Sequence, residues 1–390
     1  MTDDGGQRTE FLSRLRRANK YCVAQRTTIG LLMSAFCLLL AACGDKELPI
    51  YQEQSYVFGT LVEVSVYGED EARARLAVSE VLQEFQRLHE MLHAWQPSEL
   101  SELNAAFAKG ESLAVSSELV AILEDAAQLS KQSQGMFNPA IGGLVQLWGF
   151  HADEFKPVLP DEKLVAQWVA AKPQMSDIVI EKGRVQSKNK SVQLDLGGYA
   201  KGYALDRAAE LMRKHNIRNA LINIGGNVLA LGQPGKRAWR VGIQHPRKPG
   251  ALATLELHDG EAIGTSGDYQ RYYMVGSVRY CHLINPASGY PMQGVQAVTV
   301  LIGPPAMQQG GQAALAKSLV MSRSTQPGVM SDAASKPLFI AGSRGWRAAA
   351  AQMSLSEAML VDGQGAVHLT AGLKKRLEFT DKNLRPQVEP

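Results

Sequence analysis

Residues 195–203 constrain the fold more than any other part of the chain. They read Asp-Leu-Gly-Gly-Tyr-Ala-Lys-Gly-Tyr and lie between an alternating, strand-like run at 185–194 and a helical pattern from about Ala204 onward. A glycine-rich loop between a strand and a helix presents unpaired backbone N–H groups, which favour an anion such as phosphate. Asp195 and Lys201 bracket this loop with opposite charges. On this segment alone, an ordinary tight connection and a phosphate site are equally consistent.

In the rest of the chain, some apolar runs have the spacing of strands and others the spacing of helices, and no repeating βαβ unit is present. A strand pair or a bulged strand is expected at 51–67. Further strands are expected at 178–180, 185–194, 220–229, 239–243, 252–257, 280–285, 295–302, 358–361 and 367–370. Helices are expected at 71–93, 98–104, 116–132 and near 332–342, with short helical pieces within 151–176. This mixture predicts an α+β fold, with mixed or antiparallel strands flanked by helices, rather than a doubly wound sheet.

The N-terminus has the features of a lipoprotein signal peptide at 1–42. A basic region precedes an apolar run, 29–42, that is too short to span a bilayer comfortably. The run ends in Leu-Ala-Ala-Cys, which resembles a bacterial lipobox, so Cys43 would carry the lipid. An accidental match at the end of a plain signal or a buried helix is the alternative. We expect a bacterial periplasmic protein anchored in a membrane, with 43–50 as its tether.

The rest of the chain is expected to form one domain at 51–374. Within it, residues 303–331, rich in Gln, Gly, Ser and Pro, predict a loop insertion, and 375–390 predict a polar C-terminal tail. The 390 residues are 45% hydrophobic and 20% charged, enough for a substantial core. A net charge of +3 without a basic stripe argues against a nucleic-acid partner. Only Cys281 of the four cysteines lies in the domain sequence, which excludes an internal disulfide there.

Several glycine-containing segments carry polar side chains beside apolar strands. They are 135–139, 195–203, 222–227 and 264–269. If the fold brings them together, they would line a cleft for a large phosphorylated ligand such as a dinucleotide. The glycine pair within 222–227, taken alone, favours a bulge or a close backbone approach. The sequence has no paired-cysteine or His-Glu-x-x-His metal motif, but a Mg²⁺ site needs only one or two carboxylates and leaves little trace.

Asp332 and His282 each have a structural and a catalytic interpretation. The local pattern favours Asp332 as the N-cap of a helix over a metal ligand. Cys281 and His282 are neighbours in a strand-like run, so their side chains point to opposite faces and a Cys–His nucleophile pair is disfavoured. A lone imidazole can take a proton from a hydroxyl near neutral pH, so His282 stays open between a structural residue and a base.

Taken together, several segments resemble the ApbE family of FAD:protein FMN transferases. They are Phe58-Gly59-Thr60, 135–139 with 148–150, 195–202, 223–226, 265–269 and 282–291, in the family's order. The resemblance covers the chain from about residue 51 to 370. It implies an ApbE-like flavin transferase domain with FAD in a cleft. It also implies Mg²⁺-dependent cleavage of FAD, attachment of FMN through a phosphoester to a Thr or Ser of a partner protein, and release of AMP.

The resemblance also implies partners and residue roles. The acceptor would be a flavin-carrying subunit of a membrane redox complex. The alternative function is an FAD-binding or FAD-hydrolysing homologue that lacks transferase activity and assists assembly of a respiratory flavoprotein. The residues implied to bind FAD are Phe58, Trp95, Met136, Phe137, Asn138, Asp195, Lys201 and Leu283. The carbonyl of Gly198 and the side chain of Asp332 are the implied Mg²⁺ ligands, and His282 is the implied base for the acceptor hydroxyl.

The chain departs from the family pattern at a few positions. Asn138 and Asn285 stand where an Asp is common, which removes charge but keeps a hydrogen-bonding side chain. Lys336 replaces the Thr expected four residues after Asp332, on the same helical face. An ammonium cannot coordinate Mg²⁺ and repels a nearby cation. We expect Lys336 to reach past the metal to a phosphate oxygen; weakened metal binding with lost activity is the alternative.

Overall fold

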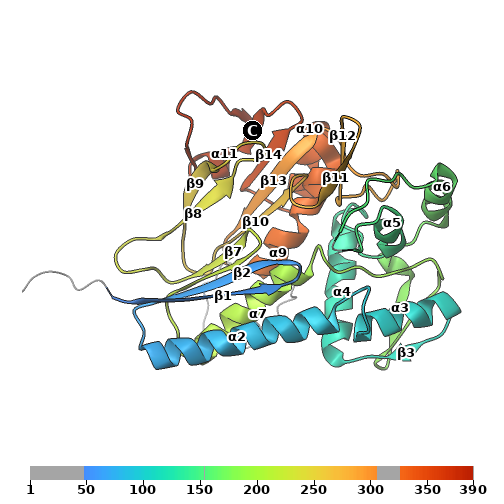
Figure 1. Ribbon diagram of the computed structural model, residues 1–390, viewed down its shortest axis with the longest axis horizontal. Coiled ribbons are helices and arrows are strands. Elements are labelled where there is room, and N and C mark those ends of the chain that lie inside the picture. The colour runs from blue at the N-terminus through green and yellow to red at the C-terminus, as the bar shows by residue number, and fades with distance from the viewer. Residues whose placement is uncertain (1–47, 153, 305–325, 390) are drawn as a thin grey trace, which may run out of the picture. The chain divides into compact units, whose positions relative to one another are not determined.

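The main sheet is built from hairpins that the alternating runs of the sequence predict. Its strands are β1 (Ile50–Val57), β2 (Thr60–Tyr67), β6 (Ala220–Ile224), β7 (Asn227–Leu231), β10 (Ala262–Gly267), β13 (Val295–Ile302), β14 (Ala358–Asp362), β15 (Val367–Thr370) and β17 (Gln387–Glu389). Their order is β1-β2-β6-β7-β10-β13-β14-β15-β17 (Figure 1). Within this sheet the β15–β17 pair is parallel and the other pairs are antiparallel. The predicted α+β class is confirmed.

This computed structural model describes residues 48–152, 154–304 and 326–389. The predicted signal peptide, Cys43 and most of the predicted insertion therefore lie outside the described residues. Smaller sheets join β3 (Leu113–Ala114), β5 (Arg184–Ser187) and β4 (Ile178–Glu181); β16 (Glu378–Phe379), β9 (Ala251–Leu257) and β8 (Trp239–Gln244); and β11 (Tyr272–Val275) with β12 (Val278–Cys281). No helix among the described residues combines the length and apolar character that a membrane span requires.

Helices pack on one face of the main sheet and a small sheet packs on the other. The described helices are α2 (Glu71–Met91), α3 (Glu99–Lys109), α4 (Ser117–Gln132), α5 (Gly142–Leu147), α6 (Glu162–Ala171), α7 (Ala200–Lys214), α9 (Pro327–Ala333), α10 (Ser335–Gln352) and α11 (Ala371–Lys374). Of these, α2, α7, α9 and α10 contact the main sheet from the helical face, whereas α11 lies in the core with the small sheet, and α5 and α6 lie in a third cluster. Strand β14 shows why both faces are covered: Ala358 and Leu360 belong to the core shared with the helices. The alternate residues, Met359 and Val361, pack in a second core with β8 and β9.

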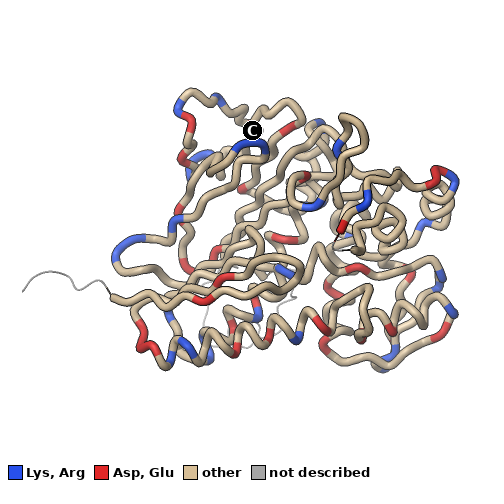
Figure 2. The backbone as a smooth tube through the Cα atoms, viewed as in Figure 1, with Lys and Arg blue, Asp and Glu red and all other residues tan. Residues whose placement is uncertain are grey.

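Helix α2 is amphipathic, as its apolar spacing predicts. Asp70 caps its first turn by accepting hydrogen bonds from the N–H groups of Ala72 and Arg73. On the solvent side, Figure 2 shows Lys and Arg interspersed with Asp and Glu along this helix. Arg75 pairs with Glu71 in that pattern, one turn apart. The buried face contacts α7, so the long helix supports the element that follows the glycine-rich loop.

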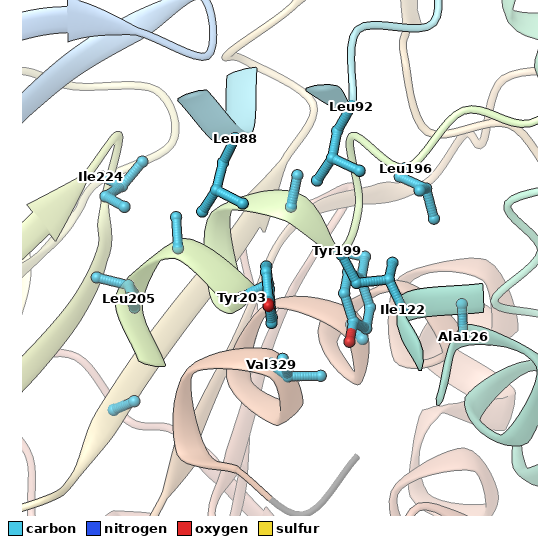
Figure 3. Close-up of a cluster of buried hydrophobic side chains, with 14 of the residues drawn as sticks. Leu88, Leu92, Ile122, Ala126, Leu196, Tyr199, Tyr203, Leu205, Ile224 and Val329 are labelled. Carbon is cyan, nitrogen blue, oxygen red and sulfur yellow. The ribbon is translucent and has the colours of Figure 1, made fainter. Parts of the chain in front are cut away.

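The start of α7 is held by a cluster of buried side chains around two tyrosines. Figure 3 shows Tyr199 and Tyr203 among Leu88, Leu92, Ile122, Ala126, Leu196, Leu205, Ile224 and Val329. The hydroxyl of Tyr199 donates to Asp125 at 2.7 Å, and that of Tyr203 donates to Glu118 at 2.7 Å. These bonds and the apolar packing fix the helical turn that carries Lys201.

Helices α7 and α9 cross in backbone contact. A Cβ added at Gly202 would lie 2.4 Å from the carbonyl oxygen of Gly328, and a Cβ at Gly328 would lie 2.4 Å from that of Gly202. Each helix also caps the other. Asp332 of α9 accepts from the N–H of Gly202 at 3.0 Å, and Asp206 of α7 accepts from the N–H of Gly328 at 2.8 Å. The crossing therefore couples the loop before α7 to the position of Asp332.

Asp332 is thus not the N-cap of its own helix, contrary to the local prediction. It lies in the last turn of α9, and α10 begins at Ser335. The predicted helix end at Gly342 is instead a kink within α10, where φ is 70° and ψ is −178°. The last residues of the predicted 303–331 insertion belong to α9, which begins at Pro327. Local sequence could not reveal the cap, because the capped N–H group is 130 residues away.

Other segments also differ from the prediction. The strand predicted at 185–194 ends at Ser187, because Asn189 forms a turn by accepting from the N–H of Ser191 at 3.0 Å. Gly225 and Gly226 form the β6–β7 hairpin turn with φ values of 58° and 92°, not a bulge, but the predicted close approach is present, because a Cβ at Gly225 would lie 2.6 Å from Oγ1 of Thr60. In the predicted tail, β16 pairs with β9 and β17 joins the main sheet, so the domain extends beyond 374.

Candidate active site

A cavity of about 600 Å³ brings together segments that are far apart in the sequence. The glycine-containing segments 135–139, 195–203, 222–227 and 264–269 all contribute to its wall, so the fold meets the condition on which the predicted cleft depended. The predicted residues that line it are Phe58, Trp95, Met136, Phe137, Asn138, Asp195, Gly198, Lys201, His282, Leu283 and Lys336. Asp332 does not line it and is 1% exposed. The volume is in the range of a site for one extended cofactor.

Aromatic residues form one part of the wall. Phe58 lies in the β1–β2 turn with φ 57°, and its ring meets that of His89 edge-on, with centroids 5.7 Å apart. Trp95 follows α2, where Nδ1 of His93 accepts from the N–H of Trp95 at 3.1 Å and from that of Gln96 at 3.0 Å. The Trp95 ring lies 5.5 Å from that of His151. Rings held in this way can stack on a flat heterocycle.

Asn138 holds its loop with both ends of its amide. Nδ2 donates to the carbonyl oxygen of Pro173 at 2.9 Å, and Oδ1 accepts from the N–H of Ala140 at 3.1 Å. Ser133 accepts from the N–H of Phe137 at 3.0 Å, which fixes the same loop. The amide of Asn138 therefore shapes this wall of the cavity. Both hydrogen bonds are made by an uncharged side chain, so this role needs no carboxylate.

The glycine-rich loop satisfies many of its own N–H groups. Asp195 accepts from the N–H of Gly197 at 2.8 Å, Leu196 accepts from that of Ala200 at 2.9 Å, and Asp332 accepts from that of Gly202. Of the two interpretations that the sequence left open, the phosphate site therefore has fewer free backbone N–H groups to offer. Side chains supply the positive charge instead: Lys201, Arg271 and Lys336 line the cavity, and Asp195 is the only carboxylate among its described lining residues. The cavity is therefore suited to an anionic ligand.

Asp332 is buried behind Lys336 and paired with it. The Lys336 ammonium contacts Oδ1 of Asp332 and donates to its carbonyl oxygen at 2.8 Å. Burial opposes ionisation of Asp332, but the charges of Lys336 and Lys201 outweigh it and hold the pKa of the carboxyl below its usual range. Both carboxylate oxygens are engaged, because Gly202 donates to Oδ2.

The donor set around Asp332 does not fit Mg²⁺. The ammonium of Lys336 lies where a cation would have to approach this carboxylate. Among the described residues, no group of three or more His, Cys, Asp and Glu side chains is placed to hold a metal ion. Mg²⁺ binds through oxygen ligands and takes no lysine nitrogen in such a site. The expectation that Lys336 reaches past a metal differs from the geometry, in which Lys336 turns back to Asp332.

His282 is positioned to accept a proton. Its main-chain N–H donates to the carbonyl oxygen of Arg271 at 3.0 Å, and Nδ1 lies 3.2 Å from the same oxygen. A carbonyl only accepts hydrogen bonds, so Nδ1 carries the proton and Nε2 keeps a lone pair. Burial, together with the charges of Arg271 and Lys201, lowers the pKa of His282 from 6.5 to about 3. The imidazole is therefore neutral at physiological pH.

Arg271 is a site residue that sequence reasoning missed. Its Nη2 donates to the carbonyl oxygen of Phe150 at 2.9 Å, its own carbonyl orients His282, and its side chain lines the cavity. The available signal was its position two residues after the 265–269 segment. His93 was missed because it holds backbone N–H groups, and no local sequence motif indicates that role. His93 holds neighbouring backbone groups, whereas Arg271 both orients His282 and adds positive charge to the cavity wall.

Comparison with known proteins matches this arrangement to one family. The profile of the ApbE family matches residues 58–323. An FAD:protein FMN transferase from Rhodobacter capsulatus is 37% identical over 380 residues, which cover 97% of this chain and 66% of that protein. A second FAD:protein FMN transferase, from Treponema pallidum, is 31% identical over 289 residues, covering 69% of this chain and 78% of that protein. The chain belongs to the ApbE family.

A solved ApbE structure has the same fold. The crystal structure of the ApbE protein from Thermotoga maritima aligns with a TM-score of 0.72 and 26% sequence identity, covering 84% of this chain and 99% of that one. The resemblance drawn from the sequence is therefore confirmed, as is the ApbE-like α+β fold. Membership of the ApbE family makes this chain one of a family of transferases. The chain spans 66% of the length of its Rhodobacter capsulatus relative.

Proposed function

We propose that this ApbE-family chain is an FAD:protein FMN transferase that cleaves FAD, attaches FMN to a Thr or Ser hydroxyl of a partner protein and releases AMP. The observation that carries the proposal is the combination, in one cavity, of side-chain cations with a neutral histidine. The cations suit a pyrophosphate, and the histidine suits an incoming hydroxyl. The relatives' shared name supports the same reaction.

The transfer step uses His282 as the general base. The acceptor hydroxyl oxygen attacks the phosphorus of the FMN half, and a new phosphoester bond forms as the P–O–P anhydride bond breaks. The bridging oxygen leaves with AMP, and the hydroxyl proton passes to Nε2 of His282. Nδ1 stays bonded to the Arg271 carbonyl, which keeps the imidazole oriented during proton transfer. Lys201 and Arg271 stabilise the negative charge that develops on the phosphoryl oxygens.

Other cavity residues hold the rest of FAD in this proposal. Phe58 and Trp95 contact its flat ring systems, with the Met136–Phe137 pair lining the adjoining wall and Leu283 supplying apolar surface beside His282. Asp195 is available to hydrogen-bond to a hydroxyl or ring N–H of the ligand. The Mg²⁺ that the resemblance implies, at the Gly198 carbonyl and Asp332, does not fit the Asp332–Lys336 pair, and we assign it no step.

The reaction is tested by incubating the purified protein with FAD and a candidate acceptor. We expect a fluorescent flavin band on the acceptor that survives SDS, together with an equimolar amount of AMP. The same acceptor with its target Thr or Ser replaced by Ala serves as the control and should show no flavin fluorescence. Free FMN and AMP without labelling would favour the hydrolysing alternative, and bound FAD without products would favour a binding role.

The acceptor and the location are part of the same proposal. The lipobox-like residues ending at Cys43 support a lipid-anchored protein in the bacterial periplasm, where the acceptor would be a flavin-carrying subunit of a membrane redox complex. We expect the Cys43→Ser variant to shift from the membrane fraction to the soluble periplasmic fraction or to keep an uncleaved leader. Fractionation and intact-mass measurement of the mature protein check this. A wild-type protein without lipid mass on its N-terminus would contradict the anchor.

A further inference from the structure

Lys336 separates Asp332 from the cavity. The Lys336 side chain is 15% exposed and lines the cavity, whereas the Asp332 side chain is 1% exposed and lies behind it. The carboxylate is fully engaged by the ammonium on Oδ1 and by the N–H of Gly202 on Oδ2. A positive charge therefore already stands on the cavity side of this buried carboxylate.

The same side chain also covers the glycine-rich loop. A Cβ added at Gly198 would lie 3.2 Å from Cε of Lys336, so the stem of the lysine packs against the loop. The lysine thereby touches both groups that the family resemblance assigns to a metal, the Gly198 segment and Asp332. Lys201 adds a second ammonium on the same wall, since both lysines line the cavity.

We propose that the Lys336 ammonium replaces the divalent cation in this chain, so that FAD binding and FMN transfer proceed without Mg²⁺. This inference rests on the proposed function and concerns only the source of positive charge. Lys336 keeps its protons throughout: it holds Asp332 on one side and donates to a pyrophosphate oxygen on the other. The bonds made and broken, and the proton transfer to His282, are those of the transfer step above.

Measurements on the wild-type protein alone test whether FAD binding and transfer require Mg²⁺. Flavin fluorescence quenching gives the affinity for FAD in EDTA and in excess MgCl₂, and we expect the two affinities to agree within about twofold. Isothermal titration with MgCl₂ alone should show no saturable binding. An affinity for FAD, or a transfer rate, that rises more than about tenfold with Mg²⁺ would overturn the inference while leaving the proposed function intact. A protein that binds no FAD in either condition would overturn both.

Two variants locate the effect at Lys336. Lys336→Thr should lose about tenfold or more of its FAD affinity in EDTA and regain it with Mg²⁺, because Asp332 is then free to hold the metal. Lys336→Arg keeps the positive charge and should stay independent of Mg²⁺. Thermal melts show whether each variant folds. A folded Lys336→Thr protein that binds FAD in EDTA as well as the wild type would overturn the inference, as would an Arg variant that requires Mg²⁺.

Discussion

Replacement of His282 by Asn is expected to slow FMN transfer by about 10²–10⁴-fold, the usual contribution of a general base. Asn keeps a polar side chain of similar width but has no basic nitrogen to take the acceptor's proton. FAD affinity is expected to stay within about threefold of wild type, because the cations and aromatic rings that hold the ligand are other residues. Transfer is measured by flavin fluorescence on the acceptor, and affinity is measured by quenching.

His258→Asn is the matched control for this substitution. His258 is exposed and does not line the cavity, so its replacement should leave transfer and FAD affinity unchanged. If His282→Asn retained wild-type transfer, the base would have to be another group. If it lost FAD binding in parallel with transfer, His282 would be a ligand-holding residue rather than the base. A loss confined to the turnover number supports the proton-accepting role.

The pH dependence gives a second readout of the same residue. The folded-state pKa of His282 lies near 3, below its ordinary 6.5, so acidification toward about pH 5 does not protonate it in the free enzyme. FAD brings negative phosphates that raise this pKa in the complex. We therefore expect the acid limb of kcat to lie at higher pH than that of kcat/KM for FAD. Coincident limbs near the ordinary histidine value would contradict the half-buried, cation-flanked setting of the imidazole.

Features that depend on local spacing could be predicted from the sequence. The β1–β2 strand pair, the span of α2 and the β14–β15 hairpin follow from alternation and helical periodicity, and the structure has them within a few residues. The glycine-containing segments beside core strands could also be picked out from local pattern, whereas individual residues such as Phe58, Trp95 and Leu283 were named only through the family resemblance, and the structure places them in the cavity wall. The convergence of these segments in one cavity was a conditional expectation that topology then fulfilled.

The remaining features depend on contacts between distant segments. Asp332 caps α7 rather than its own helix, and Asp206 caps α9 in return, so neither role has a local signature. The sequence left the loop at 195–203 open between an ordinary tight connection and a phosphate site, and Asp332 and the loop's own residues use several of its N–H groups. The side chain of Lys336 is a further example. The sequence shows that a lysine is present, but the direction of its side chain depends on the buried Asp332 carboxylate with which it pairs.

Gly202→Ala is expected to destabilise the protein by about 1–3 kcal/mol, because the new methyl overlaps the α7–α9 crossing. An Ala in a helix interior ordinarily adds about 0.5–1 kcal/mol of stability relative to Gly. At Gly202 the added Cβ would lie 2.4 Å from the carbonyl oxygen of Gly328, a main-chain atom that moves only if α9 moves. The helices must then separate, which lengthens the bond from Gly202 to Asp332. Chemical denaturation measures the change.

Gly345→Ala is the control for the sign of the change in stability. Gly345 also lies in a helix, α10, but a Cβ there would meet only the methyl of Ala341, at 3.1 Å. We expect this substitution to be neutral or to stabilise by up to about 1 kcal/mol. Displacement of α9 should also move Asp332, and with it the paired Lys336 of α10, and so weaken FAD binding in the Gly202 variant alone. Equal stability changes for the two variants would contradict the close crossing, and lost stability with unchanged FAD affinity would show that the crossing does not position the site.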